Sequence, residues 1–176
     1  MKKLLLSLVL GVTLGQMGFT QTILNVPWYS QKIDECSSYT WCGAASALMV
    51  FDYYKQQTKT TQEVKNKLKE YIDNYFKVGY CSGALDFDQI RKLAQEYEQF
   101  TDVVTDKVKD YNILREAINN GFPVILNIHF TGVDGGLVNG STWHWIVLTG
   151  IDNENVWIND PGTVYENKGR EKKYPI

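Results

Sequence analysis

The sequence predicts an α+β domain in which N-terminal helices pack on a C-terminal antiparallel sheet. Two observations lead to this fold class. Between residues 43 and 119 several segments show helical spacing of apolar residues, and from Pro123 onward the pattern changes to short runs rich in Val and Ile. No internal repeat, low-complexity tract or linker interrupts the sequence, so residues 21–176 are expected to form one domain with its own core.

The first 20 residues have the layout of a secretory signal peptide. Lys2 and Lys3 form a basic start, residues 4–12 are mostly apolar, and small residues that suit a cleavage site follow. The apolar run ends before Gln16 and is short for a membrane span. We therefore expect an exported protein, secreted or periplasmic, with no stable membrane span after cleavage. An uncleaved N-terminal anchor or a buried helix is the alternative.

Four helices are expected in the first part of the domain. Thr60 with Glu63 and Asp86 with Gln89 have the spacing of capping boxes, and Gly121 is a natural C-terminal cap for the last helix. Helix formers and apolar stripes then predict helices over residues 43–54, 61–71, from 86 onward, and 111–119.

Strands are expected after the helices. The predicted strands cover residues 123–130, 143–151 and 155–159, with a Gly-rich loop over 131–142 and a hairpin turn at 152–154. Residues 24–29 are expected to form a short strand or an extended segment before the first helix, and residues 34–40 a polar loop.

The composition limits the kinds of partner and cofactor. Lys2 and Lys3 are the only charged residues of the first 20, so residues 21–176 carry a formal net charge of −4, against −2 for the whole chain. This balance indicates no nucleic-acid-binding surface. The three cysteines, Cys36, Cys42 and Cys81, leave one thiol over if two of them pair. The Cys and His residues lack close metal-ligand spacing, so neither a metal nor a cofactor is expected.

Cys42 is the candidate nucleophile. It lies just before the first predicted helix, where unpaired N–H groups and the helix dipole favour a thiolate. Its own N–H could help to hold an oxyanion. The alternative is a small buried cysteine without a chemical role.

A cysteine nucleophile needs a general base, and the sequence contains only two histidines. His144 follows the Gly-rich loop at the start of a strand, where reactive groups tend to lie, and is the preferred candidate. His129 lies near the end of a predicted core strand and is expected to be a structural histidine.

Two further polar residues complete the candidate site. If the hairpin turns near Asn153, Asp160 falls almost opposite His144 and could orient its ring, whereas alternation turns Asn159 to the other face. The alternative for Asp160 is an ordinary Asp-Pro-Gly turn. Gln31 could donate a second oxyanion hydrogen bond; otherwise it is an exposed polar residue.

Together these segments resemble the stand-alone relatives of the bacteriocin-processing, double-glycine leader peptidases, which are papain-like cysteine peptidases. The resemblance rests on Asn25-Val-Pro-Trp-Tyr-Ser-Gln31, Trp41-Cys-Gly-Ala-Ala-Ser46, Asn120-Gly-Phe-Pro-Val-Ile125, His144-Trp-Ile-Val-Leu-Thr-Gly150 and Asn159-Asp-Pro-Gly162. It implies a papain-like fold with Cys42 as nucleophile, His144 as base, Asp160 as orienting residue and Gln31 as oxyanion donor.

The resemblance also implies an activity on a peptide or protein substrate. The chain carries no transporter and has its own predicted signal peptide, so cleavage after Gly-Gly is not a firm expectation. Two other functions stay open: hydrolysis of peptidoglycan amide bonds with the same residues, and an inactive papain-like binding module. With Cys42 as nucleophile, Cys36 and Cys81 are left as a candidate disulfide. The sequence ends soon after Asp160, so the last sheet edge is expected to be short.

Overall fold

The structure is a computed structural model that describes residues 22–33, 40–77, 84–101, 110–130, 142–163 and 165–176. The predicted signal peptide, the polar loop up to residue 39 and residues 131–141 of the Gly-rich loop lie outside the described residues. Cys36 and Cys81 also lie outside them, so their pairing stays a prediction.

The helical part contains the predicted helices, and two of them continue in an unexpected form. The α-helices are α1 (Cys42–Lys55), α2 (Thr61–Lys69), α3 (Phe87–Lys92) and α4 (Tyr111–Asn119). Capping boxes start α2 and α3 as predicted, and Gly121 follows α4 with a positive φ of 82°. Two π-helical segments, η1 (Glu70–Tyr75) and η2 (Leu93–Tyr97), extend α2 and α3. Helical periodicity did not predict these wider turns.

The sheet has four antiparallel strands in sequence order. They are β1 (Val124–Phe130), β2 (Thr142–Ile151), β3 (Asn155–Asn159) and β4 (Lys172–Pro175). The first three match the predicted strands, and the α+β fold class is confirmed. The short helix α5 (Glu166–Gly169) and strand β4 were not predicted, because neither has an apolar repeat. Lys172 and Lys173 keep the edge strand β4 polar, which is a common protection of a sheet edge.

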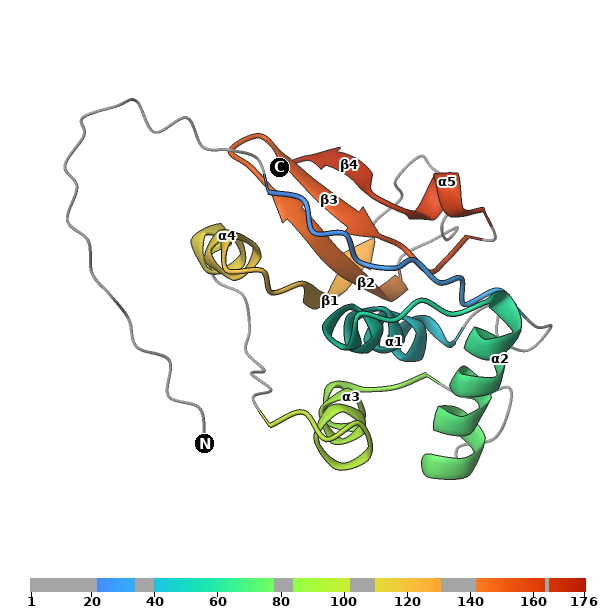
Figure 1. Ribbon diagram of the computed structural model, residues 1–176. Coiled ribbons are helices and arrows are strands. Elements are labelled where there is room, and N and C mark those ends of the chain that lie inside the picture. Colours follow the sequence, from blue (N-terminus) through green and yellow to red (C-terminus); the bar gives the residue numbers. More distant parts are fainter. Residues whose placement is uncertain (1–21, 34–39, 78–83, 102–109, 131–141, 164) are drawn as a thin grey trace.

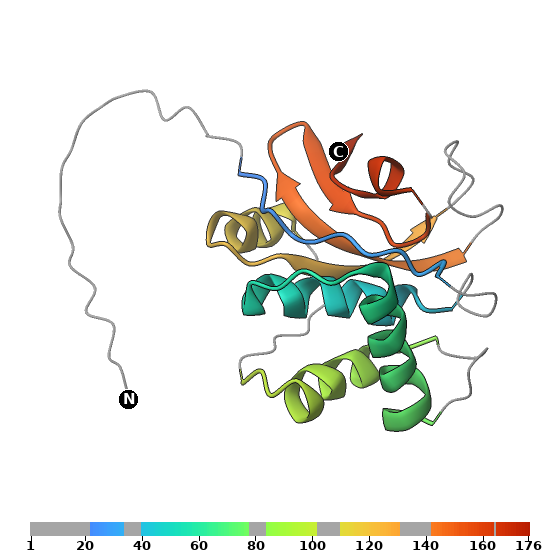
Figure 2. The same cartoon turned by 45° about the vertical axis from the view of Figure 1, so that its right-hand side comes forward.

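Helix α1 is the centre of the fold. Figures 1 and 2 show it between the sheet on one side and α2 and α3 on the other. Its residues from Cys42 to Asp52 are all buried, and it packs chiefly on β2. A helix that is buried on all sides can present its first residue at the edge of the sheet with little freedom to move.

The extended segment 22–33 runs along the boundary between α1 and the sheet (Figures 1 and 2). Ile23 bridges to Gly150, and the N–H of Leu24 donates to the carbonyl of Thr149 at 2.8 Å. The Asn159 side chain donates to the carbonyl of Val26 at 3.0 Å. The expected extended segment is therefore fixed to the sheet along its length.

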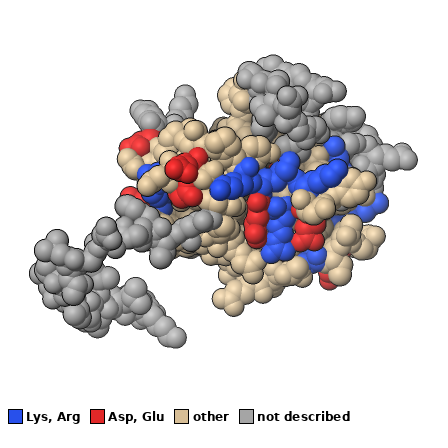
Figure 3. Space-filling model, turned by 90° about the horizontal axis from the view of Figure 1, so that it is seen from above, with Lys and Arg blue, Asp and Glu red and all other residues tan. Residues whose placement is uncertain are grey.

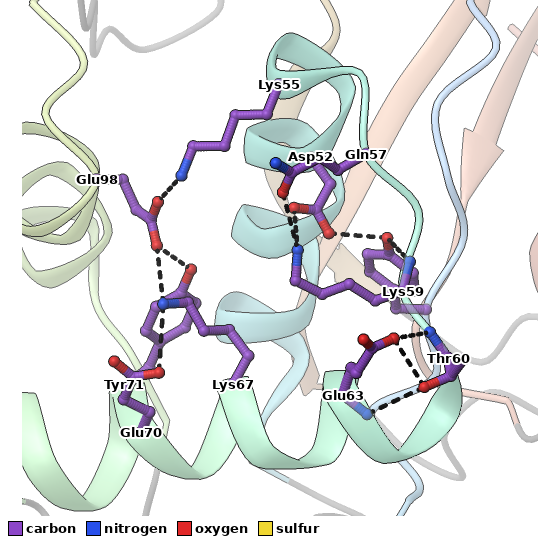
Figure 4. Close-up of polar contacts among 11 residues, drawn as sticks. Asp52, Lys55, Gln57, Lys59, Thr60, Glu63, Lys67, Glu70, Tyr71 and Glu98 are labelled. Carbon is purple, nitrogen blue, oxygen red and sulfur yellow. Dashed lines mark hydrogen bonds and ion pairs between the residues drawn. The ribbon is translucent and has the colours of Figure 1, made fainter.

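A polar network joins the helices on the other side of α1, as Figure 4 shows. The Glu98 carboxylate lies beyond η2 and pairs with Lys55 of α1 and Lys67 of α2, and it accepts a hydrogen bond from the Tyr71 hydroxyl at 2.6 Å. Asp52 of α1 binds Lys59 at 2.6 Å. These contacts hold α2 and η2 against the C-terminal half of α1.

The charged surface mixes both signs. On the face seen from above in Figure 3, Lys and Arg side chains lie beside Asp and Glu. Arg170, for example, contacts both Glu166 and Glu171. None of the helices in the described part of the chain is long and apolar enough to span a membrane.

Candidate active site

Cys42 is the first residue of α1 and is 8% exposed. Thr60, Asp86 and Asp110 each cap the helix that follows them, but Trp41 provides no side-chain cap for α1. The first turn of α1 therefore receives no cap from the side chain of its N-cap residue, and N–H groups at a helix start can stabilise negative charge.

Gly43 allows α1 to approach the sheet next to Cys42. A Cβ atom at this position would lie 3.2 Å from the Trp145 ring and 3.3 Å from the Ile90 side chain. The Trp145 indole N–H donates to the carbonyl of Leu85 at 3.0 Å, which fixes the ring there. The site therefore combines the start of α1 with the beginning of β2.

His144 lies near the start of β2 and is 4% exposed. Its Nε2 atom is 2.9 Å from Oδ1 of Asp160. Burial lowers the pKa of His144, but hydrogen bonds to Asp160 and Cys42, together with the charges of these two groups, outweigh it and raise the pKa from 6.5 to about 9. The titratable groups that act on the imidazole are thus Cys42 from α1 and Asp160 from beyond β3.

The Asp160 carboxylate is fully buried. Its Oδ1 atom accepts hydrogen bonds from His144 and from the N–H of Gly162 at 2.6 Å, whereas Oδ2 has no hydrogen-bond partner among the described residues. A Cβ atom on Gly162 would lie 3.0 Å from Oδ1 of Asp160 and 3.2 Å from Nε2 of His144. Glycine at this position therefore permits the close approach of the turn to the histidine.

The predicted contact of His144 with Asp160 is present, but the two residues are offset by two positions instead of lying almost opposite each other. The pairing of β2 with β3 changes register between Leu148 and Gly150, so Thr149 is the extra residue of a β-bulge. Continuing the register past β3 places Asp160 opposite the residue two positions after His144. Both side chains still lie on the same face of the sheet, because residues two apart share a face. The three-residue turn and the bulge together displace the strands.

Gln31 is buried, with 3% exposed, so the alternative that it is an exposed polar residue is wrong. Its N–H donates to the carbonyl of Pro161 at 2.9 Å, directly after Asp160. Gln31 therefore belongs to the part of the extended segment that contacts the Asp160 turn.

His129 lies apart from this group. It is exposed on the edge strand β1, and its ring lies 5.0 Å from that of Trp143. The expectation that this end of the strand lies in the core is therefore wrong, whereas the structural role of His129 stays a prediction. The sequence of β1 is mostly apolar, but the strand lies at the edge of the sheet, and its end at His129 is exposed.

A hollow of about 860 Å³ lies elsewhere in the molecule. Its walls include Tyr29, Asp52 and Arg170, but none of the four predicted site residues. We place the candidate active site at Cys42 rather than in this hollow, because the thiol, imidazole and carboxylate meet at Cys42. Among the described residues, no group of three or more His, Cys, Asp or Glu side chains could hold a metal ion.

Sequence reasoning did not single out three residues that shape the site. In the sequence, Gly162 indicates only a turn, and Trp28 and Gly169 indicate no role at the site. Trp28 hydrogen-bonds the carbonyl of Asp160, and Gly169 accepts a hydrogen bond from the Asp160 N–H. The nearness of Trp28 to Gln31 in sequence was the only available signal.

The helical part that carries Cys42 and the antiparallel sheet that carries His144 form a papain-like α+β fold. The chain belongs to the Peptidase C39-like family, whose model matches residues 23–175. It is similar to a crystal structure from Bacillus anthracis described as a C39-like peptidase, with 21% sequence identity and a TM-score of 0.56. That match covers 89% of this chain and 88% of the other and supports the fold. No curated protein matches the chain significantly.

Proposed function

We propose that this protein is an exported cysteine peptidase that hydrolyses peptide bonds through Cys42, His144 and Asp160. The observation that carries the proposal is the buried contact of His144 with Asp160 at 2.9 Å, together with the hydrogen bond between His144 and Cys42 at the start of α1. A cysteine, a base and a group that orients the base are the elements of nucleophilic catalysis. Membership of a peptidase-like family supports the same function.

The contacts of the His144 ring indicate which chemical role each group takes. Nε2 of His144 binds Asp160, which leaves Nδ1 for the thiol of Cys42. The thiolate attacks the substrate carbonyl, and the imidazolium then gives its proton to the leaving amine. Water, deprotonated by the same imidazole, attacks the thioester and releases the carboxylic acid and the free thiol.

The oxyanion of each tetrahedral intermediate needs hydrogen-bond donors. The N–H of Cys42 is one candidate donor, because it lies at the start of a helix whose N-cap residue, Trp41, provides no side-chain cap. The side-chain amide of Gln31 is the second, and its burial beside the Asp160 turn would fix its position. We propose these two groups as the oxyanion site.

The test is cleavage of a peptide library by the protein lacking residues 1–20, with products identified by mass spectrometry. We expect Cys42-dependent cleavage, and a loss of at least about 10³-fold in Cys42→Ala. The library should include peptides with and without Gly-Gly, and purified cell wall should be assayed in parallel. Release of cell-wall peptides without peptide cleavage would replace the peptidase by an amide hydrolase, and no Cys42-dependent product in either assay would reject the proposal.

Export has a separate test. Expression of the full chain in a bacterial host should give a protein outside the cytoplasm that has lost about the first 20 residues. Deletion of residues 1–20 should keep the protein in the cytoplasm. N-terminal sequencing of both fractions distinguishes this from a retained anchor, which would leave the full-length chain in the membrane.

A further inference from the structure

The backbone of Asp160 is held from two sides. Its N–H donates to the carbonyl of Gly169 at 2.7 Å, and its carbonyl accepts a hydrogen bond from the indole N–H of Trp28, also at 2.7 Å. The first partner lies at the end of α5 and the second in the extended segment. Among the described residues the side chain of Asp160 is held through Oδ1 alone, so these backbone bonds help to control where the carboxylate lies.

The contact of Trp28 with Asp160 depends on Gly169. A Cβ atom on Gly169 would lie 2.3 Å from Nε1 of Trp28 and 2.6 Å from the carbonyl oxygen of Asp160. Any larger residue would occupy the space in which the hydrogen bond forms. The glycine therefore leaves room for the indole to reach the backbone of the orienting residue.

Two further residues of the extended segment, Ser30 and Gln31, bind the loop formed by residues 160–163. The Ser30 hydroxyl donates to the carbonyl of Thr163, and the N–H of Gln31 donates to the carbonyl of Pro161. Residues 28–31 thus supply three hydrogen bonds to the carbonyl groups of residues 160–163. The segment that carries Gln31 and the loop that carries Asp160 are consequently one hydrogen-bonded unit.

We propose that Trp28 and Ser30 are positioning residues for the peptidase reaction, which hold the 160–163 loop so that the Asp160 carboxylate meets His144. The proposal rests on the proposed function of Cys42, His144 and Asp160. Neither side chain takes part in the chemical steps. Losing either bond would let the loop move, and small displacements of groups that orient a catalytic base reduce the rate strongly.

The test compares Trp28→Phe, which keeps an aromatic ring but loses the N–H, and Ser30→Ala with the wild-type protein. We expect kcat to fall about tenfold in Trp28→Phe and somewhat less in Ser30→Ala, with KM little changed. The high-pH limb of kcat should move to lower pH, because a displaced Asp160 supports the His144 proton less well. Trp157→Phe, which changes a buried tryptophan of β3 whose ring lies against Lys173, is the matched control and should behave as wild type.

A second readout does not need peptidase activity. The rate at which iodoacetamide alkylates Cys42 can be measured at each pH from the mass of the labelled peptide. In both variants, the inflection of this rate at high pH, which reports loss of the His144 proton, should lie at lower pH than in wild type. If Trp28→Phe does not fold, Ser30→Ala decides the question. Peptide cleavage with unchanged kcat and unchanged pH profiles in the folded variants would overturn the positioning role. Absence of cleavage in wild type with a shifted alkylation profile would reject the proposed function but keep the positioning role.

Discussion

His144 and Asp160 lie on the same face of the sheet because of one extra residue in β2. Beyond the bulge, Gly150 pairs with Trp157, and this register alone would turn Asp160 to the opposite face from His144. The extra residue at Thr149 shifts the pairing by one position and restores the shared face. A bulge that re-aims a side chain in this way is a common device beside active sites.

The bond between His144 and Asp160 leads to a prediction for Asp160→Asn. The amide keeps an acceptor for Nε2 but removes the negative charge, so the pKa of His144 should fall below about 9. Since the leaving amine needs the imidazolium proton, wild-type kcat/KM should decline above about pH 9. In Asp160→Asn this decline should begin at lower pH, by about one unit or more.

The matched control is Asp88→Asn, which makes the same chemical change in a carboxylate that is 78% exposed on α3. Its pH profile should equal that of wild type. An Asp160→Asn profile with an unshifted high-pH limb would mean that Asp160 does not support the charge of His144.

The two histidines give a direct comparison. His144→Ala should lower kcat/KM by at least about 10³-fold, because it removes the group that contacts both Cys42 and Asp160. His129→Ala should keep activity within a few-fold of wild type, because His129 is exposed on an edge strand. Steady-state kinetics of both purified variants decides between them, and loss of activity in His129→Ala alone would contradict the choice of base.

Much of the fold was predictable because the relevant patterns are local. The helix formers of α1 and the β-rich runs of β1 to β3 predict those elements to within one or two residues. In η1 and η2 the apolar residues are spaced as they would be in an α-helix, so this spacing does not reveal that the turns are π-helical. Strand β4 forms by pairing with β3, although its own sequence is mostly charged and polar.

The candidate site was predictable in its residues but not in its geometry. Cys42 and His144 stand out because of position and because the sequence has few histidines. The bulge at Thr149 has no sequence signal beyond a Thr-Gly pair, and it depends on contacts with the segment at Leu24. The role of Trp28 depends on Gly169, which lies 141 positions away, so no local pattern could reveal it.

The close approach of Gly162 to His144 and Asp160 predicts that a larger residue at this position lowers kcat. In Gly162→Ala, the new methyl group would lie 3.0 Å from Oδ1 of Asp160 and 3.2 Å from Nε2 of His144. We expect kcat to fall by about 10- to 100-fold, because the carboxylate must move away from the ring. Gly121→Ala is the control, since the positive φ of 82° at this position strains any other residue there, at the end of α4 and away from the site.

Both glycine variants should lose stability, which thermal unfolding measures. Only Gly162→Ala should lose activity at temperatures where both proteins are folded. Equal activity losses in the two variants would show that destabilisation, and not the position of Asp160, limits the rate.

The raised pKa of His144 also predicts a pH dependence of stability. The folded value of about 9 lies above the ordinary value of 6.5, so protonation of His144 stabilises the folded protein fully below about pH 6.5, and this contribution is lost as pH rises through 9. The shift corresponds to a free energy on the order of 3 kcal/mol. The Cys42→Ala variant removes one of the two groups that raise the pKa of His144, and should show a reduced form of this decline.

Urea unfolding of Cys42→Ala between pH 6 and 9.5 measures the decline. Adding Asp160→Asn should remove most of it, because the carboxylate supports the charged ring. A free energy of unfolding that rises over this interval in Cys42→Ala would have the wrong sign and would reject the assignment of a charged, buried His144.

The buried contacts of Asp52, which lies away from the active site, predict that replacing it greatly lowers the free energy of unfolding. Its buried carboxylate accepts hydrogen bonds from the Tyr29 hydroxyl at 2.8 Å and from the Lys59 ammonium at 2.6 Å. Burial, and then the hydrogen bond to Asp52, raise the pKa of Tyr29, so its hydroxyl stays protonated and available as a donor. Asp52→Ala leaves both donors without this acceptor and should cost about 3 kcal/mol of unfolding free energy.

The control for this change is Asp88→Ala, which breaks an exposed ion pair with Arg91 and should cost less than about 1 kcal/mol. Urea unfolding of the two variants at neutral pH gives the comparison. A loss in Asp52→Ala as small as in Asp88→Ala would mean that water replaces the carboxylate, and that the network beside α1 contributes little. The expected larger loss would show that this network holds the buried helix whose first residue is Cys42.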